Sequence, residues 1–188
     1  MLRLNNQEIR NCVYSGEFND MLKKFDREDK AWQQVKKRIW GTMGRFRSIE
    51  ILLRVIAFSN NLDRYNGNLA GFLNSYMGTS TKLESDNIEQ MMVKLSFMSA
   101  CAFEFLSSLS SGKKSLTFME AALVALFSNV NILSAMDADA LHEYLLAKSK
   151  SFVVLPSFVN VQRYALSSEQ IVKARLREAI NLFSSDIA

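Results

Sequence analysis

The chain has 188 residues, of which 48% are hydrophobic and 22% are charged, and this balance excludes a disordered protein and fits one globular domain. It contains 13 Phe and 9 Met but only 7 Gly and one Pro, a composition that favours helix over strand. The net charge is +4. The two Cys and the single His lack the spacing of a disulfide framework or a zinc site, so we expect a reducing compartment.

The first forty residues predict three short helices. Asn5 and Glu8 have the spacing of a capping box, which predicts a first helix that ends near Tyr14, before Ser15 and Gly16. The N-terminus turns polar at once and has no signal peptide, so we expect a cytoplasmic protein. A second helix begins at Glu17, and its apolar stripe consists of Phe18, Met21, Leu22 and Phe25. A third spans 32–39, and Gly41 and Gly44 then mark a loop.

The middle of the chain predicts three more helices. One starts at Arg45, with Ile49, Leu52, Leu53 and Ile56 on a single face. After a turn-rich connection over 60–68, a short helix runs from Leu69 to Met77 and ends at Gly78. A long helix follows over 84–109, and residues 110–114 form its loop.

The last third contains the most apolar segment. A helix from about Leu116 to Val130 is expected to be central in the bundle, and polar residues within 119–133 keep this run below the roughly 20 apolar residues that span a bilayer. Asp137 or Asp139 caps the next helix, over 140–148. Residues 151–164 are expected to be irregular, with Phe152–Leu155 as the most strand-like run. Ser167 and Gln170 form a second capping box, which opens a last helix through Leu182.

These segments predict an all-α fold, a bundle of about seven to nine helices in a single domain over 1–188. Within it, residues 1–77 hold the basic N-terminal helices, and residues 84–188 hold the apolar core and the C-terminal helix. Positive charge is concentrated early, because residues 1–64 contain 13 Lys and Arg against 8 Asp and Glu, whereas the remainder contains 10 against 11. Attraction to an anionic partner is therefore expected in the first third.

A cluster of cations lies over 36–47 with no acid among them. It consists of Lys36, Lys37, Arg38, Arg45 and Arg47, with Trp32, Trp40 and Phe46 beside it. Cations neutralise phosphates and release counterions, and exposed aromatic rings stack on unpaired bases, so Lys36, Lys37, Arg38, Arg45, Arg47 and Trp40 are the candidate DNA-binding residues. The alternative is an ordinary solvated face with buried tryptophans.

No catalytic arrangement emerges from the residues. His142 is the only histidine, so neither Ser/His/Asp nor Cys/His chemistry has its partners, and we expect no catalytic residue, metal or cofactor. Asp137 and Asp139 are most simply helix caps, and the Gly41–Gly44 segment lacks the order of a phosphate-binding loop. The stripes of Met and Phe over 91–105 and 118–127 are expected to be core.

Three segments resemble the GmrSD-type restriction endonucleases. The first, Leu4–Asp20, reads LNNQEIRNCVYSGEFND and is the most specific; the others are 45–58 (RFRSIEILLRVIAF) and 65–77 (YNGNLAGFLNSYM), with a weaker likeness near the C-terminus. Proteins of this family have a ParB-like or sulfiredoxin-like nuclease domain followed by helices, and this chain resembles only the helical C-terminal half, mainly over residues 4–77. The family's Asp-Gly-Gln-Gln-Arg motif does not occur in this sequence, which implies half of a split protein, a truncated relative or a fragment.

The resemblance implies a non-catalytic helical domain of a modification-dependent restriction or phage-defence system, which positions DNA or a nuclease partner. The expected partners are a nuclease domain or partner chain and DNA, with a homo-oligomer as a further option and no membrane. In this family the first block adjoins the nucleotide-using domain. The resemblance of the three blocks implies a set of residues at the interface or near a nucleotide: Gln7, Glu8, Arg10, Asn11, Asn19, Arg54 and Tyr65. The alternative is a stand-alone protein–protein interaction or regulatory module that has lost the nuclease half, and a cryptic enzyme is a weaker third.

Overall fold

The computed structural model describes residues 5–40, 47–109, 115–159 and 168–184. About 85% of these residues are helical and none forms a strand, which confirms the predicted all-α bundle. Eleven helices lie within the described residues, and nine of them have seven residues or more.

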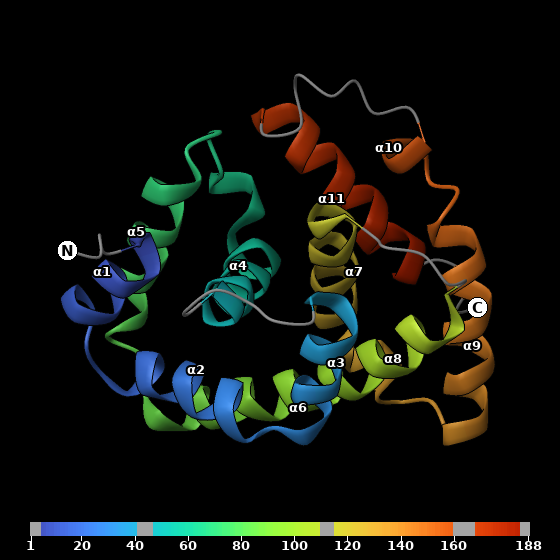
Figure 1. Ribbon diagram of the computed structural model, residues 1–188, viewed down its shortest axis with the longest axis horizontal. Coiled ribbons are helices and arrows are strands. Elements are labelled where there is room, and N and C mark those ends of the chain that lie inside the picture. Colours follow the sequence, from blue (N-terminus) through green and yellow to red (C-terminus); the bar gives the residue numbers. More distant parts are fainter. Residues whose placement is uncertain (1–4, 41–46, 110–114, 160–167, 185–188) are drawn as a thin grey trace.

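The N-terminal half occupies one side and the middle of the view in Figure 1. It contains α1 (Asn6–Val13), α2 (Glu17–Glu28), α3 (Lys30–Trp40), α4 (Arg47–Asn61), the 3-10 helix η1 (Leu62–Arg64) and α5 (Leu69–Ser80). The capping box at Asn5 is present, because its side chain accepts a hydrogen bond from the Glu8 amide and Glu8 accepts one from the Asn5 amide. Gly16 has a φ of 143°, which an L side chain rarely adopts, and so it permits the sharp turn between α1 and α2.

The C-terminal half contains the longest helix and the most buried one. Its elements are α6 (Ser85–Ser108), α7 (Leu116–Ser128), α8 (Val130–Leu133), α9 (Ala138–Phe152), α10 (Pro156–Val159) and α11 (Glu169–Ser184). Every residue from Phe118 to Phe127 is buried, and α7 packs against α4, α6, α8 and α11. This apolar helix is therefore central, as its composition predicts.

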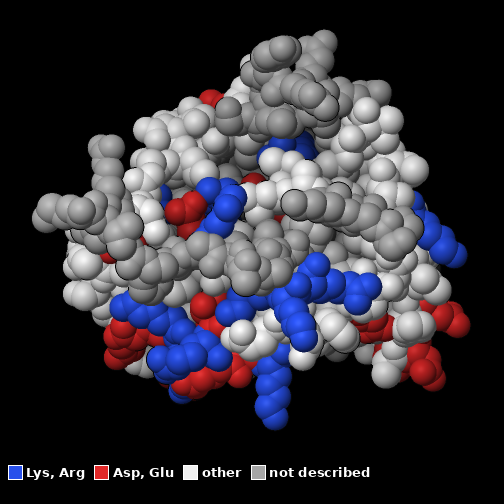
Figure 2. Space-filling model, viewed as in Figure 1, with Lys and Arg blue, Asp and Glu red and all other residues white. Residues whose placement is uncertain are grey.

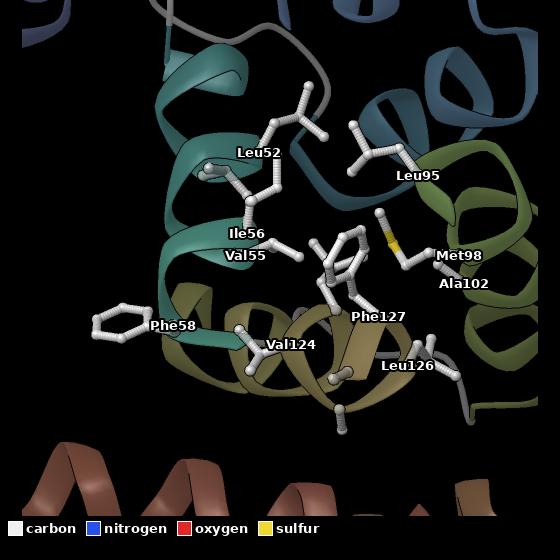
Figure 3. Packing of buried hydrophobic residues seen from close by; sticks show 14 of the residues in the cluster. Leu52, Val55, Ile56, Phe58, Leu95, Met98, Ala102, Val124, Leu126 and Phe127 are labelled. Carbon is white, nitrogen blue, oxygen red and sulfur yellow. The ribbon is translucent and has the colours of Figure 1, made fainter. Parts of the chain in front are cut away.

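The buried apolar side chains form one cluster that draws on both halves of the chain. Figure 3 shows α4 directing Leu52, Val55 and Ile56 toward α6 and α7. From the other side Leu95 and Met98 of α6 meet Phe127 of α7. Helices α2 and α3 lie along α6 and cover its outer side.

Three predicted boundaries were wrong. Helix α5 continues through Gly78 to Ser80, because Gly78 lacks the positive φ with which a glycine ends a helix. Helix α7 ends at Ser128 and not at Val130, since the Asn129 side chain turns back to the carbonyl of Ala125 and also reaches that of Ile180.

The third correction concerns the segment predicted to be irregular, where α10 spans Pro156–Val159 and α9 continues past Lys148 to Phe152, which leaves no strand at Phe152–Leu155. Burial explains it: the Phe152 ring is inaccessible to solvent, and its centroid lies 4.9 Å from that of Phe118 and 5.4 Å from that of Phe105. The predicted loops at 41–44 and 110–114 and the cap at Ser167 lie outside the described residues. Among the described helices, none is both long and apolar enough to cross a bilayer.

Candidate functional site

Helix α3 carries the cations of the predicted DNA-binding cluster. It starts where the Asp29 carboxylate accepts a hydrogen bond from the Trp32 amide at 2.7 Å. Trp32 is completely buried; its indole N–H donates to the Asp26 carboxylate at 2.8 Å, and its ring packs near Phe25. Trp32 therefore belongs to the core and cannot stack on a base. The side chains of Arg45, Phe46 and Trp40 lie outside the described residues.

The three cations of the predicted cluster that lie on α3 differ in what they contact. Lys36 is held inward, because its ammonium donates to the Asp26 backbone carbonyl at 2.6 Å and lies 3.1 Å from the Asp26 carboxylate. Lys37 and Arg38 are exposed, and so is Arg47 at the start of α4. None of these three forms a salt bridge within the described part of the chain. We use the name basic face for these three exposed cations, two on α3 and one at the start of α4.

Figure 2 places this charge on the molecule. Basic side chains gather over the part of the visible face where α3 runs, whereas basic and acidic side chains are mixed over α2. The mixing over α2 agrees with two ion pairs there, Lys23 with Asp20 and Arg27 with Glu28. The exposed cations of the predicted cluster that lack an acidic partner among the described residues thus lie on α3 and at the start of α4.

A second group of candidate residues lies on the inner side of α1. Gln7, Glu8 and Arg10 are buried, with Arg10 only 3% exposed. The Arg10 guanidinium donates to Gln7 of its own helix at 3.1 Å, to Asn74 of α5 at 2.9 Å and to Glu50 of α4 at 3.1 Å. One arginine therefore fastens α1 to two other helices through charge-assisted hydrogen bonds.

The chain of contacts continues from α4 to α7. Glu50 also accepts a hydrogen bond from Arg54 at 2.5 Å, and Arg54 donates to Glu120 of α7 at 3.0 Å. We call these connected side chains the polar network: Gln7, Arg10, Glu50, Arg54, Asn74 and Glu120. Burial by itself would lower the pKa of Arg54, but Glu120 and Glu50 together raise it above its ordinary value.

Two further groups lie within the electrostatic reach of Glu120. Burial lowers the pKa of Arg175 on α11, an effect that Glu120 only partly offsets. Burial also raises the pKa of Tyr65, and Glu120 adds to that increase. Tyr65 itself packs edge-on against Phe58 and Phe72. Through Glu120, the electrostatic effect of the polar network thus extends to Arg175 on α11.

The remaining candidates of this group join α1 to α2. Gln7 donates to the Asn11 side chain at 3.0 Å, and the Asn19 side chain donates to the Asn11 carbonyl at 3.3 Å. All seven predicted interface residues therefore make contacts inside the domain: Gln7, Glu8, Arg10, Asn11, Asn19, Arg54 and Tyr65. The exposed side of α1 is largely apolar. Ile9 is 47% exposed, Val13 is 64% exposed, and Cys12 is exposed as well. We call Ile9, Cys12 and Val13 the outer face of α1.

Sequence reasoning missed four residues around the polar network: Glu50, Asn74, Glu120 and Arg175. Two signals were available, the spacing of four residues between Glu50 and Arg54 and the single acid within the apolar helix at Glu120. Nothing local to Asn74 or Arg175 marks them, since their partners come from distant segments.

The other titratable candidates have simple roles. His142 is exposed and hydrogen-bonded to Glu104 of α6, and Asp137 caps α9 by accepting from the Ala140 amide at 2.8 Å. No group of three or more His, Cys, Asp and Glu side chains among the described residues could hold a metal ion.

Comparison of the chain with protein-family models, with curated proteins and with solved structures gives no match.

Proposed function

We propose that this chain is a non-catalytic helical accessory domain that positions DNA, or a partner carrying the nuclease, in a modification-dependent restriction or phage-defence system. The resemblance of residues 4–77 to the GmrSD-type family supports the setting, and the basic face supports contact with DNA. The observation that carries the proposal is the exposure of Lys37, Arg38 and Arg47 without an acidic partner among the described residues.

The contacts of Trp32 and Lys36 indicate which part of the DNA the basic face would bind. Because Trp32 is buried and Lys36 is bound to Asp26, neither adds stacking or an available charge to the basic face. The described cations therefore favour contact with phosphates, which carries little sequence information. Base-specific recognition would come from another domain or chain.

The test is DNA binding as a function of salt. Replacement of Lys37, Arg38 and Arg47 with alanine removes up to three phosphate contacts, so the magnitude of the slope of log K against log salt should fall by up to roughly 3. Helical content should be retained, because alanine is a good helix former. Fluorescence anisotropy with a labelled duplex, at several salt concentrations, gives the slope.

The matched control replaces three exposed cations elsewhere, Arg64, Lys82 and Lys150, with alanine. The net charge falls by the same amount, but the salt slope should stay close to that of the wild type. If the magnitude of the slope falls by the same amount in both triple variants, binding depends on total charge and the basic face has no special role. If the wild type does not bind DNA at all, the DNA part of the proposal is wrong.

A second candidate function is a protein–protein interaction or regulatory module, and the outer face of α1 favours it. A helix that buries Gln7 and Arg10 while exposing Ile9 and Val13 reverses the usual arrangement of a surface helix. The double variant Ile9→Ser, Val13→Ser distinguishes the two functions. It should bind DNA like the wild type but lose co-purification with a nuclease chain that carries the Asp-Gly-Gln-Gln-Arg motif. Loss of DNA binding in this variant, with helicity intact, would instead place α1 within the DNA surface.

A further inference from the structure

A groove with a volume of about 540 Å³ lies between the N-terminal half of α6 and α8, away from the residues discussed so far. The α6 residues that line it follow the spacing of one helical stripe and include Asp86, Glu89, Val93, Lys94 and Phe97. From Asp86 to Phe97 this stripe is about 16 Å long, which is three turns of helix.

The groove has an apolar wall. Val93 is 69% exposed, and Phe97 beside it is half-buried. Val130, the first residue of α8, faces the same groove and is 6% exposed. A valine open to water in the middle of a helix, next to a phenylalanine, leaves apolar surface that a partner's side chain can cover.

The charges of the groove are arranged along its length. Asp86 and Glu89 are exposed at the end nearer the start of α6, and Lys94 lies about 12 Å from Asp86 along the helix. None of the three takes part in a salt bridge or a side-chain hydrogen bond within the described residues. Two carboxylates at one end repel phosphate, so a nucleic acid is a poor occupant, whereas they attract a cationic group.

We propose that this groove binds a short amphipathic helix of a partner protein, with an apolar side chain against Val93, Phe97 and Val130 and a Lys or Arg near Asp86 and Glu89. The length of the stripe fits three turns of such a helix, and the apolar wall provides the anchor. The two carboxylates select the cationic end and thereby fix the direction in which the helix lies.

The probe for this proposal is a pair of fluorescein-labelled designed helices of about 14 residues, or about 21 Å. Both carry one leucine stripe; one ends in two lysines and the other in two glutamates. The full chain should bind the lysine peptide more tightly. The Val93→Lys substitution should weaken that binding by roughly tenfold or more, because it places a charge on the apolar wall. The double variant Asp86→Lys, Glu89→Lys should reverse the preference between the peptides.

Val154→Lys is the matched control, since Val154 is 66% exposed but does not line the groove. It should bind like the wild type, and circular dichroism should show the same helicity for every variant. Equal affinity for the two peptides, no binding below about 1 mM, or an unchanged preference after charge reversal would overturn the proposal. A dimer of the wild-type chain that Val93→Lys abolishes would assign the groove to a second copy and would also overturn it.

Discussion

Arg54 lies between two carboxylates that come from different helices, Glu50 one turn earlier on α4 and Glu120 on α7. A charge removed from water is tolerated only when it is paired and hydrogen-bonded. The pKa of Arg54 rises because these two acids outweigh burial, whereas the pKa of Arg175 falls because burial outweighs the help from Glu120. Glu120 thus acts on two arginines, the half-buried Arg54 and the buried Arg175.

Replacement of Glu120 by glutamine tests that effect. The change keeps the size of the side chain but removes its charge, so Arg54 loses one of its two anionic partners and the electrostatic effect of Glu120 on Arg175 is removed. We expect the free energy of unfolding to fall by about 2 kcal/mol, less than the cost of breaking a fully buried ion pair, because Arg54 is half-buried and keeps Glu50. Urea unfolding followed by circular dichroism measures it.

Glu89→Gln is the control for this substitution. Glu89 is exposed and forms no salt bridge with a described residue, so its replacement should change the free energy of unfolding by less than about 0.5 kcal/mol. Similar losses in the two variants would show that Glu120 contributes nothing beyond an ordinary surface acid.

At the scale of single elements, α1 buries polar side chains and exposes apolar ones, the opposite of an ordinary surface helix. Its inner side is polar because Arg10 joins it to Asn74 of α5 and Glu50 of α4, and hydrogen bonds replace the usual apolar contact. Its ends are set locally, by the capping box at Asn5 and by the positive φ of Gly16 after it. The helix is therefore positioned by directional contacts, and Ile9 and Val13 are left for solvent or a partner.

The start of α9 offers a test of local capping. Asp137 accepts the hydrogen bond from the Ala140 amide, whereas Asp139 lies within the first turn. Asp137→Ala should lower the free energy of unfolding by about 1 kcal/mol, because a backbone amide loses its acceptor. Asp139→Ala removes the same charge but no cap, and should cost only a few tenths of a kcal/mol through the helix dipole. Urea unfolding of both variants measures the difference, and a larger loss for Asp139→Ala would contradict the assignment of the cap.

The whole molecule is organised around α7, which contacts α4 on one side, α11 on another and α6 on a third. A single cluster of buried side chains surrounds it, and Cys101 of α6 belongs to that cluster at 2% exposure. Burial raises the pKa of the Cys101 thiol to about 12. Because the thiolate is the reactive form, Cys101 reports whether the core opens.

Thiol labelling therefore tests whether the bundle unfolds as one unit. At pH 8 only about one Cys101 thiol in ten thousand would be ionised in the folded protein, so labelling should proceed through unfolding. In a Cys12→Ser variant the labelling rate of Cys101 should rise with urea in parallel with the loss of helicity. Cys12 is exposed and should react at once in a Cys101→Ala variant. Fast labelling of Cys101 without urea would show that α6 opens separately from the rest of the bundle.

The sequence by itself determined the helical class, most helix starts and the central place of α7. Those features depend on contacts within about four residues, such as the bond between Asn5 and Glu8, or on a run that is apolar on all sides, such as Phe118 to Phe127. The same local rules failed at Gly78, Asn129 and Phe152. There a glycine in helical conformation, a distant carbonyl and a buried aromatic cluster decide where the helices end.

Only the tertiary structure decided which candidate residues remain accessible. Lys36 and Lys37 are adjacent and alike in sequence, yet one is bound to Asp26 and the other points to solvent. Arg10 and Arg54 were expected at an interface, and their partners turned out to lie 40 and 66 residues away within the same domain. The spacing of Glu50 and Arg54 indicates one pair of the polar network, but pairs between distant helices depend on how the helices pack, which no periodicity along the chain encodes.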